Sequence, residues 1–179
     1  MAPPESLCIL RLSALGDVTH VLPTLRTLQQ HWPQCHITWV IGKTEASLVN
    51  DIPGVEFIIF DKSQGVKAYR ELHEKLKNRR FDVLLHMQAA LRASLASLLI
   101  RADVRLGFDR ARATNGQWLF TNARIAPQKR QHVLDGFFGF LEKLGIRQRE
   151  MRWDVPIPEA ARAFVAQHVA PAERLLVIN

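Results

Sequence analysis

The chain contains 179 residues, a length that suits one domain with a complete hydrophobic core. Apolar residues make up 47% of the chain and charged residues 23%, which excludes a wholly disordered protein. The formal net charge is +7, and residues 92–152, with twelve Lys and Arg against five Asp and Glu, account for all of it. Such a localised excess of basic residues indicates an anionic partner: a nucleic acid, an acidic membrane surface or a phosphorylated substrate. The alternative is that these charges are scattered over a solvated surface and bind nothing.

Secretion and membrane signals are missing from the sequence. The amino terminus lacks the basic start and apolar core of a signal peptide, and no apolar run approaches the roughly 18 residues of a membrane span. Cys8 and Cys35 do not make a disulfide framework, so we interpret both as small hydrophobic residues in or beside buried strands. We therefore expect a cytoplasmic protein.

A strand, a turn and a helix are predicted at the start of the chain. The apolar run 7–12, interrupted only by Arg11, is too short for a helix and predicts a buried strand. A small-residue turn follows at 13–16, and apolar residues with helical spacing run from 18 to 28. Ligands of open α/β sheets gather at such a junction. Asp17 lies there, either as a helix N-cap or as a catalytic group.

Strands and helices continue to alternate along the chain. This order predicts the α/β class, with a doubly wound, Rossmann-like parallel sheet. The further strands are expected at 36–41, 56–60, 81–87 and 104–108. The further helices are expected at 44–50, 66–76, 91–100, 134–144 and 159–169. A mobile loop is expected at 61–65, after the third strand.

Several basic residues near predicted strand ends are candidates for binding anions. Arg92 lies near a helix start, where its charge opposes the helix dipole, so it either binds a ligand or simply extends into water. Arg110 and Arg112 share a polar loop, and the guanidinium fork suits phosphate and carboxylate. We expect these three arginines to converge near Asp17 with the lysine-containing segment 61–67.

The stretch from Leu12 to Leu25 resembles the amino-terminal signature of the bacterial heptosyltransferases, the family 9 glycosyltransferases. In that family a Ser-x-x-Gly-Asp turn carries the proposed catalytic aspartate, and the matching residues here are Ser13, Gly16 and Asp17. The resemblance implies that Asp17 is the general base and that the other two shape the turn.

The resemblance extends to three later positions. Gln88 and Arg92 fit a family pattern of a Gln, a small-residue turn and a basic residue, although Ala89 replaces the usual Gly. A family acceptor-binding arginine falls in the loop 109–116, and His132 is similar to a family His at a helix start, although a lone His is more often structural. The implied acceptor-binding residues are Ser13, Gly16, Lys62, Lys67, Gln88, Arg92, Arg110, Arg112 and His132.

The resemblance implies the amino-terminal half of a two-domain GT-B glycosyltransferase. Residues 1–170 would form the acceptor-binding domain, and 171–179 a linker and the first strand, with Leu175 to Ile178, of a missing nucleotide-sugar domain. The implied reaction is an inverting transfer of heptose from ADP-heptose to the Kdo/heptose inner core of lipopolysaccharide. The expected partners are the lipid A core acceptor, the nucleotide-sugar donor and the cytoplasmic face of the inner membrane. The donor is expected to bind mainly to the missing domain. The fragment alone is expected to be inactive.

The sequence contains no Cys/His set at metal-ligand spacing, so neither a metal nor a cofactor is expected. Two other function classes remain open. A non-catalytic Rossmann-like module that binds an anionic glycolipid or a protein would explain the basic excess but not the position of Asp17. Nucleic-acid binding is disfavoured, because the aromatic residues lie in apolar segments rather than between the basic ones.

Overall fold

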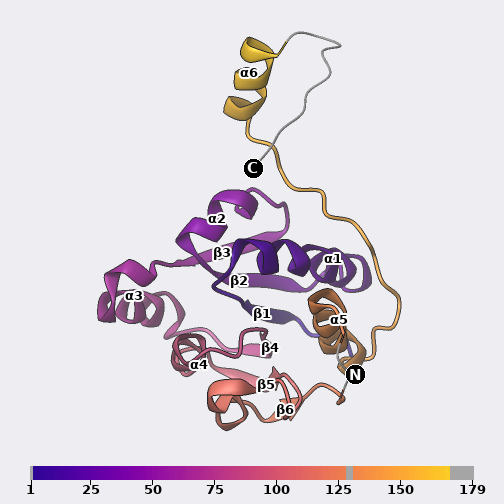
Figure 1. Ribbon diagram of the computed structural model, residues 1–179. Coiled ribbons are helices and arrows are strands. Elements are labelled where there is room, and N and C mark those ends of the chain that lie inside the picture. The colour runs from indigo at the N-terminus through magenta and orange to yellow at the C-terminus, as the bar shows by residue number, and fades with distance from the viewer. Residues whose placement is uncertain (1, 128–130, 170–179) are drawn as a thin grey trace.

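The computed structural model describes residues 2–127 and 131–169. Its centre is a six-stranded, wholly parallel sheet with strand order β3-β2-β1-β4-β5-β6 (Figure 1). The chain begins in the middle of the sheet and winds outward in both directions, so the predicted doubly wound Rossmann-like fold is confirmed. The strands are β1 (Ser6–Leu10), β2 (His36–Gly42), β3 (Val55–Phe60), β4 (Phe81–His86), β5 (Ala102–Gly107) and β6 (Ala123–Arg124).

Helices cover both faces of this sheet. One face packs against α1, α2 and α5, and the other against α3 and α4 (Figure 1). The α-helices are α1 (Leu15–His31), α2 (Lys43–Val49), α3 (Val66–Leu76), α4 (Leu91–Ser97), α5 (Val133–Lys143) and α6 (Glu159–His168). Two segments of 3-10 helix, η1 (Lys62–Gln64) and η2 (Thr114–Phe120), follow β3 and β5.

Strand β1 shows why the apolar run forms a central strand. Leu7 and Ile9 belong to the core on the α1 side, and Cys8 and Leu10 belong to the core on the α3 side. Both faces are buried because successive side chains of a strand point in opposite directions, which requires an unbroken apolar sequence. Cys8 is a free thiol whose complete burial raises its pKa far above the ordinary value. It is a packed core residue, as expected.

Several element boundaries differ from the sequence prediction. Helix α1 begins at Leu15 with Ala14 as its N-cap, so the interpretation of Asp17 as an N-cap is wrong. Segment 61–65 is not an open loop, because it contains η1, and Asp61 accepts two hydrogen bonds from Ser63 at 3.1 and 2.6 Å. These bonds hold the pKa of Asp61 well below its usual range. Helix α4 ends at Ser97, three residues earlier than expected.

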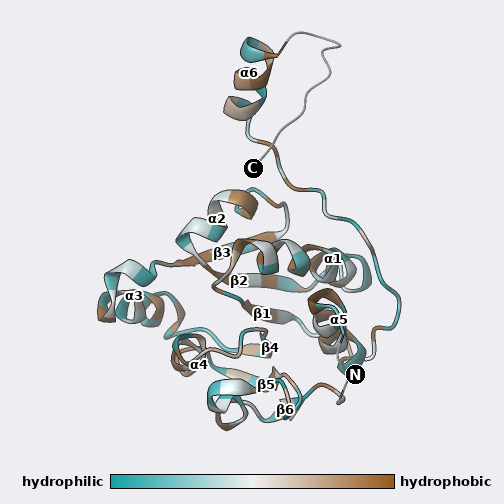
Figure 2. Ribbon diagram, viewed as in Figure 1, coloured by the Kyte–Doolittle hydropathy of each residue, from teal (hydrophilic) through white to brown (hydrophobic). Residues whose placement is uncertain are grey.

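Helix α5 packs on the sheet, whereas α6 lies apart from it (Figure 1). Helix α5 ends, as predicted, before Gly145, whose φ of 95° favours glycine. Helix α6 has no buried residue, although it carries apolar as well as polar residues (Figure 2). The predicted strand 175–178 and the proposed domain boundary at 170–171 lie outside the described residues. Within the described part, no helix is long and apolar enough to cross a membrane.

Candidate functional site

A pocket of about 290 Å³ lies at the carboxyl end of the sheet, where ligands of this fold class gather. It is bordered by the starts of α1 and α5 and by the segments that follow β1, β4 and β5. Larger pockets, of about 390 and 560 Å³, surround residues 33–36 at the start of β2, at the opposite end of the strands. The lining residues of the carboxyl-end pocket are Arg11, Asp17, Ala89, Phe108, Arg112, Gln131, His132, Val133, Gly136 and Phe137.

Asp17 enters this pocket from the first turn of α1 and pairs with Arg11. The Arg11 side chain is 11% exposed and that of Asp17 is 35% exposed, so the carboxylate is the partner that solvent or a substrate can reach. Arg11 Nη1 also donates to the carbonyl oxygen of Met87 at 2.6 Å, and its guanidinium lies 5.3 Å from the centre of the Phe137 ring. Burial lowers the pKa of Arg11, and the Asp17 carboxylate opposes this shift.

Arg11 is a site residue that the sequence analysis missed. The sequence does carry a signal for it, because Arg11 is the single charged residue in the otherwise apolar run 7–12. A charge at such a position is seldom tolerated without a partner. The partner follows only six residues later, and the turn between them makes the contact possible.

The predicted turn at 13–16 is held by the side chain of Gln88, which follows β4. Gln88 Nε2 donates to Ser13 Oγ at 2.9 Å, and Gln88 Oε1 accepts from the backbone N–H of Leu12 at 2.7 Å. Gln88 therefore fixes the turn and does not line the pocket. Gly16 lies in open space, since a Cβ built on it would meet nothing within 4 Å. The backbone there is accessible to a ligand.

Arg112 reaches the pocket from the loop after β5. Its Nε donates to the buried carboxylate of Asp109 at 2.5 Å, and its guanidinium lies 5.5 Å from the centre of the Phe108 ring. On the other side, a Cβ on Gly136 would lie 2.8 Å from Arg112 Nη1. The absence of a side chain at Gly136 thus makes room for this guanidinium.

His132 is the N-cap of α5, and its Nδ1 accepts the backbone N–H of Leu134 at 3.3 Å. Because Nδ1 is an acceptor there, the neutral ring carries its proton on Nε2. The His20 ring packs edge-on against it, with 4.9 Å between ring centres. His132 is thus at the helix start that the family resemblance implied, and it lines the same pocket as Asp17.

The expected convergence of basic residues is only partly observed. Of the described basic residues singled out from the sequence, Arg112 lines the pocket with Asp17, whereas Arg92 and Arg110 do not. Lys62 and Lys67 are also outside its lining, and Lys67 Nζ lies 3.6 Å from a carboxylate oxygen of Glu71. The reason is topological: segment 61–67 follows β3, at the edge of the sheet, whereas the pocket lies beside β1, β4 and β5.

A buried polar cluster supports the loops around the pocket. Gln117 Nε2 lies 3.1 Å from His86 Nδ1 and donates to the His86 carbonyl oxygen at 2.8 Å, and Gln117 Oε1 accepts from the N–H of Phe108 at 3.2 Å. Burial, followed by the charge of Arg105, lowers the pKa of His86 to about 4. The cluster joins β4, β5 and η2, and sequence alone offered no signal for it. Among the described residues, no group of three or more His, Cys, Asp and Glu could hold a metal ion.

Comparison with known proteins gives consistent similarities. The chain is 44% identical over 176 residues to the lipopolysaccharide core heptosyltransferase OpsX of Haemophilus influenzae, covering 98% of this chain and 51% of that protein. It is 26% identical to lipopolysaccharide heptosyltransferase 1 of Escherichia coli K12, covering 84% of this chain and 51% of that protein. The chain therefore spans about half the length of these relatives.

Solved structures show the same fold. A family 9 glycosyltransferase from Veillonella parvula matches with a TM-score of 0.79 at 21% identity, over 94% of this chain and 50% of that one. Heptosyltransferase WaaC of E. coli with ADP matches with a TM-score of 0.73 at 22% identity, over 84% of this chain and 51% of that one. The sequence model of glycosyltransferase family 9 (heptosyltransferase) matches residues 69–179. From these findings, the chain belongs to glycosyltransferase family 9.

Proposed function

We propose that this chain is the acceptor-side half of an inverting heptosyltransferase. The reaction would transfer heptose from ADP-heptose to the Kdo/heptose inner core of lipopolysaccharide. Family membership and the 44% identity to a lipopolysaccharide core heptosyltransferase support the reaction class. The single structural observation that carries the proposal is the partly exposed Asp17 carboxylate, held by Arg11 in a pocket at the carboxyl end of the sheet.

Asp17 is the proposed general base. Inversion needs a group that accepts the proton of the acceptor hydroxyl while that oxygen attacks the sugar from the side opposite to the departing nucleotide, and a carboxylate within hydrogen-bond reach can serve. Arg11 is the proposed positioning residue. It engages Asp17 through Nη2 while its Nη1 donates to the carbonyl oxygen of Met87, so the carboxylate is oriented by a side chain that is itself held at the end of β4.

Arg112 and His132 are the proposed acceptor contacts in this pocket. A guanidinium suits the phosphate and carboxylate groups of a lipopolysaccharide core, and the neutral His132 ring offers an Nε2–H donor for a sugar oxygen. Ser13 and Gly16 would shape the turn beside the acceptor. More distant acceptor contacts are proposed for Lys62, Lys67, Gln88, Arg92 and Arg110.

The donor is proposed to bind mainly to a second domain outside this chain, so the chain alone would be inactive. The coverage of about half of each relative supports a two-domain enzyme, with residues 1–170 on the acceptor side and 171–179 leading into the donor side. The proposed reaction uses no cofactor beyond its donor. The proposed place of action is the cytoplasm, in peripheral contact with the inner membrane.

The proposal is tested by measuring ADP release from ADP-heptose by the complete protein. Reactions would contain Kdo-bearing lipid A, the same acceptor with one heptose, or no acceptor. Acceptor-dependent release, with a product of inverted anomeric configuration by NMR, is expected. Release that is independent of acceptor, or a product that retains the donor configuration, would refute the proposed reaction.

A further inference from the structure

Helix α4 and segment η2 together present an exposed apolar surface that the proposed reaction does not explain. The exposed residues Leu91 and Leu95 of α4 and its C-cap Leu98 recur at intervals of four and three, which places them on one side of the helix. The neighbouring η2 exposes Trp118 and Leu119. We refer to these five residues as the α4–η2 patch.

The two parts of the patch are joined structurally. Segment η2 packs against α4, and the side chains of Thr114 and Asn115 donate to the carbonyl oxygen of Ala89 at 3.0 and 3.1 Å, directly before α4. Leu98 is 61% exposed and Leu119 is 67% exposed. Large apolar side chains gathered in this way mark an interaction surface more often than scattered ones do.

The charge around the patch indicates the kind of partner. Residues 91–127, which contain the patch, hold six Arg against two Asp and no Glu. Arg92 is exposed on α4 beside the leucines, and burial of an apolar face flanked by arginines suits a surface of anionic lipids. Trp118 fits this environment as well, because indole rings favour the boundary between lipid and water. An acidic protein partner would match the charge but not call for five exposed apolar side chains.

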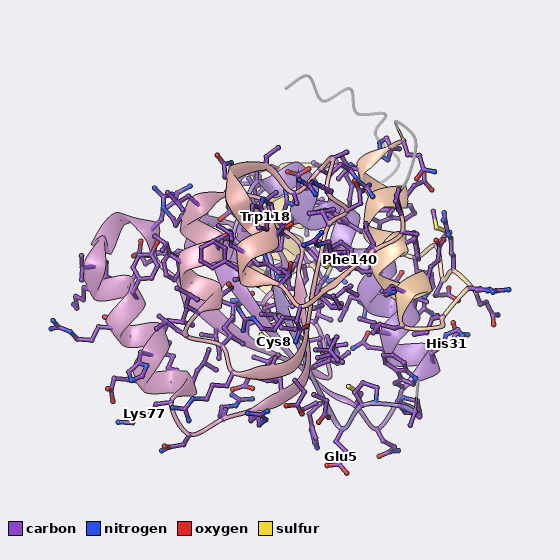
Figure 3. All side chains as sticks on the ribbon, turned by 90° about the horizontal axis from the view of Figure 1, so that it is seen from below. Glu5, Cys8, His31, Lys77, Trp118 and Phe140 are labelled. Atoms are coloured by element: carbon purple, nitrogen blue, oxygen red, sulfur yellow. The ribbon has the colours of Figure 1, made fainter. Side chains whose placement is uncertain are left out.

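The α4–η2 patch lies near the pocket that contains Asp17. Figure 3 shows Trp118 on the opposite side of the molecule from Glu5 and Lys77, which mark the amino ends of the strands, so it lies towards the carboxyl end of the sheet. Ala89 lines the pocket and accepts the hydrogen bonds from η2. A membrane that covers the α4–η2 patch would therefore be close to the pocket of Asp17.

We infer that the α4–η2 patch docks on an anionic lipid bilayer, with the leucines and Trp118 in the interface and the arginines near the lipid phosphates. This deepens the membrane contact included in the proposed function by assigning it to named residues. A bilayer without any sugar acceptor should suffice, so lipid docking and glycosyl transfer can fail independently.

The test is co-sedimentation of the complete protein with vesicles of phosphatidylglycerol and phosphatidylethanolamine, or of phosphatidylcholine alone. The double variant Leu98→Gln with Leu119→Gln should weaken binding to the anionic vesicles on the order of ten-fold or more, because two apolar side chains no longer enter the interface. The matched control is Phe164→Gln with Val165→Gln on α6, which removes apolar side chains of 62% and 53% exposure away from the patch. The control should bind as the unchanged chain does.

Two further measurements test whether binding depends on charge and on Trp118. Binding to anionic vesicles should fall as salt rises, and Trp118→Phe should abolish most of the blue shift of fluorescence that accompanies binding. Circular dichroism verifies that each variant is folded. Equal vesicle binding by the patch and control variants would overturn the inference, as would no binding at all. A third outcome is that the unchanged protein and the control variant dimerise in sedimentation whereas the patch variant stays monomeric. The patch would then be an interface between copies, and the lipid inference would be wrong.

Discussion

Arg11 and Asp17 form an ion pair that closes the turn between β1 and α1 and faces the carboxyl-end pocket. The arginine follows the central strand, and its second nitrogen is held by the carbonyl oxygen of Met87 beyond the neighbouring strand β4. The position of the carboxylate therefore depends on the pairing of β1 with β4 as well as on the local turn.

Replacing Asp17 by Asn in the complete protein should lower turnover by about 10²–10⁴-fold, because the amide cannot accept the acceptor proton. Acceptor binding should change much less, since the amide keeps the size of the side chain. Turnover with ADP-heptose and affinity for the acceptor would be measured separately. Near-normal turnover would reduce Asp17 to a partner of Arg11. Asp17→Ala provides a second comparison, because it removes the hydrogen bond to Arg11 as well as the charge.

Replacing Arg11 by Met should lower the free energy of unfolding by about 1–3 kcal/mol, because the carbonyl oxygen of Met87 loses its donor and Asp17 loses its cation. Arg11→Lys is the matched control. Lys keeps the charge but cannot reproduce the two-point contact, so its loss should be smaller. Urea unfolding of the chain measures both variants. Equal stability of the Arg11→Met variant and the unchanged chain would mean that the pair contributes nothing to the fold.

Replacing Gly136 by Ala should displace Arg112 from the pocket. The new Cβ would lie 2.8 Å from Arg112 Nη1, and a flexible side chain yields more easily than the helix backbone. Ala favours a helix over Gly, so stability should change by less than about 1 kcal/mol. In the complete protein the acceptor KM should rise several-fold with kcat nearly unchanged. Arg112→Lys shows the effect of losing the guanidinium alone, and an unchanged KM in both variants would remove Arg112 from the acceptor site.

His86 should make the fold less stable in acid. Burial lowers its pKa to about 4 in the folded chain, whereas an unfolded chain has a His pKa of about 6.5. The unfolded state therefore binds the proton first as the pH falls, so stability is lost between about pH 6.5 and 4, by up to about 3 kcal/mol. Urea unfolding at several pH values measures this loss. His86→Gln should flatten the profile in that range, whereas the control His73→Gln, at an exposed position on α3, should leave it unchanged.

The sequence by itself determined the fold class and the place of Asp17 at the junction of β1 and α1. An unbroken apolar run such as 7–10 is too short for a helix and is typical of a strand that is covered on both faces. Because such strands alternate with amphipathic helices along the chain, the sequence predicts a doubly wound parallel sheet. The signature around Ser13, Gly16 and Asp17 likewise identified the turn, because its residues are neighbours in the chain.

Only the tertiary structure decided which distant residues share the pocket. Arg110 and Arg112 lie two residues apart in one polar loop, yet of these two only Arg112 lines the pocket, because Asp109 and the lack of a side chain at Gly136 direct its guanidinium there. The role of Arg11 also depended on tertiary contacts, since its partners include the end of β4, 76 residues away. Periodicity reports which face of an element is buried, whereas the meeting of side chains depends on strand order and on the packing of each loop.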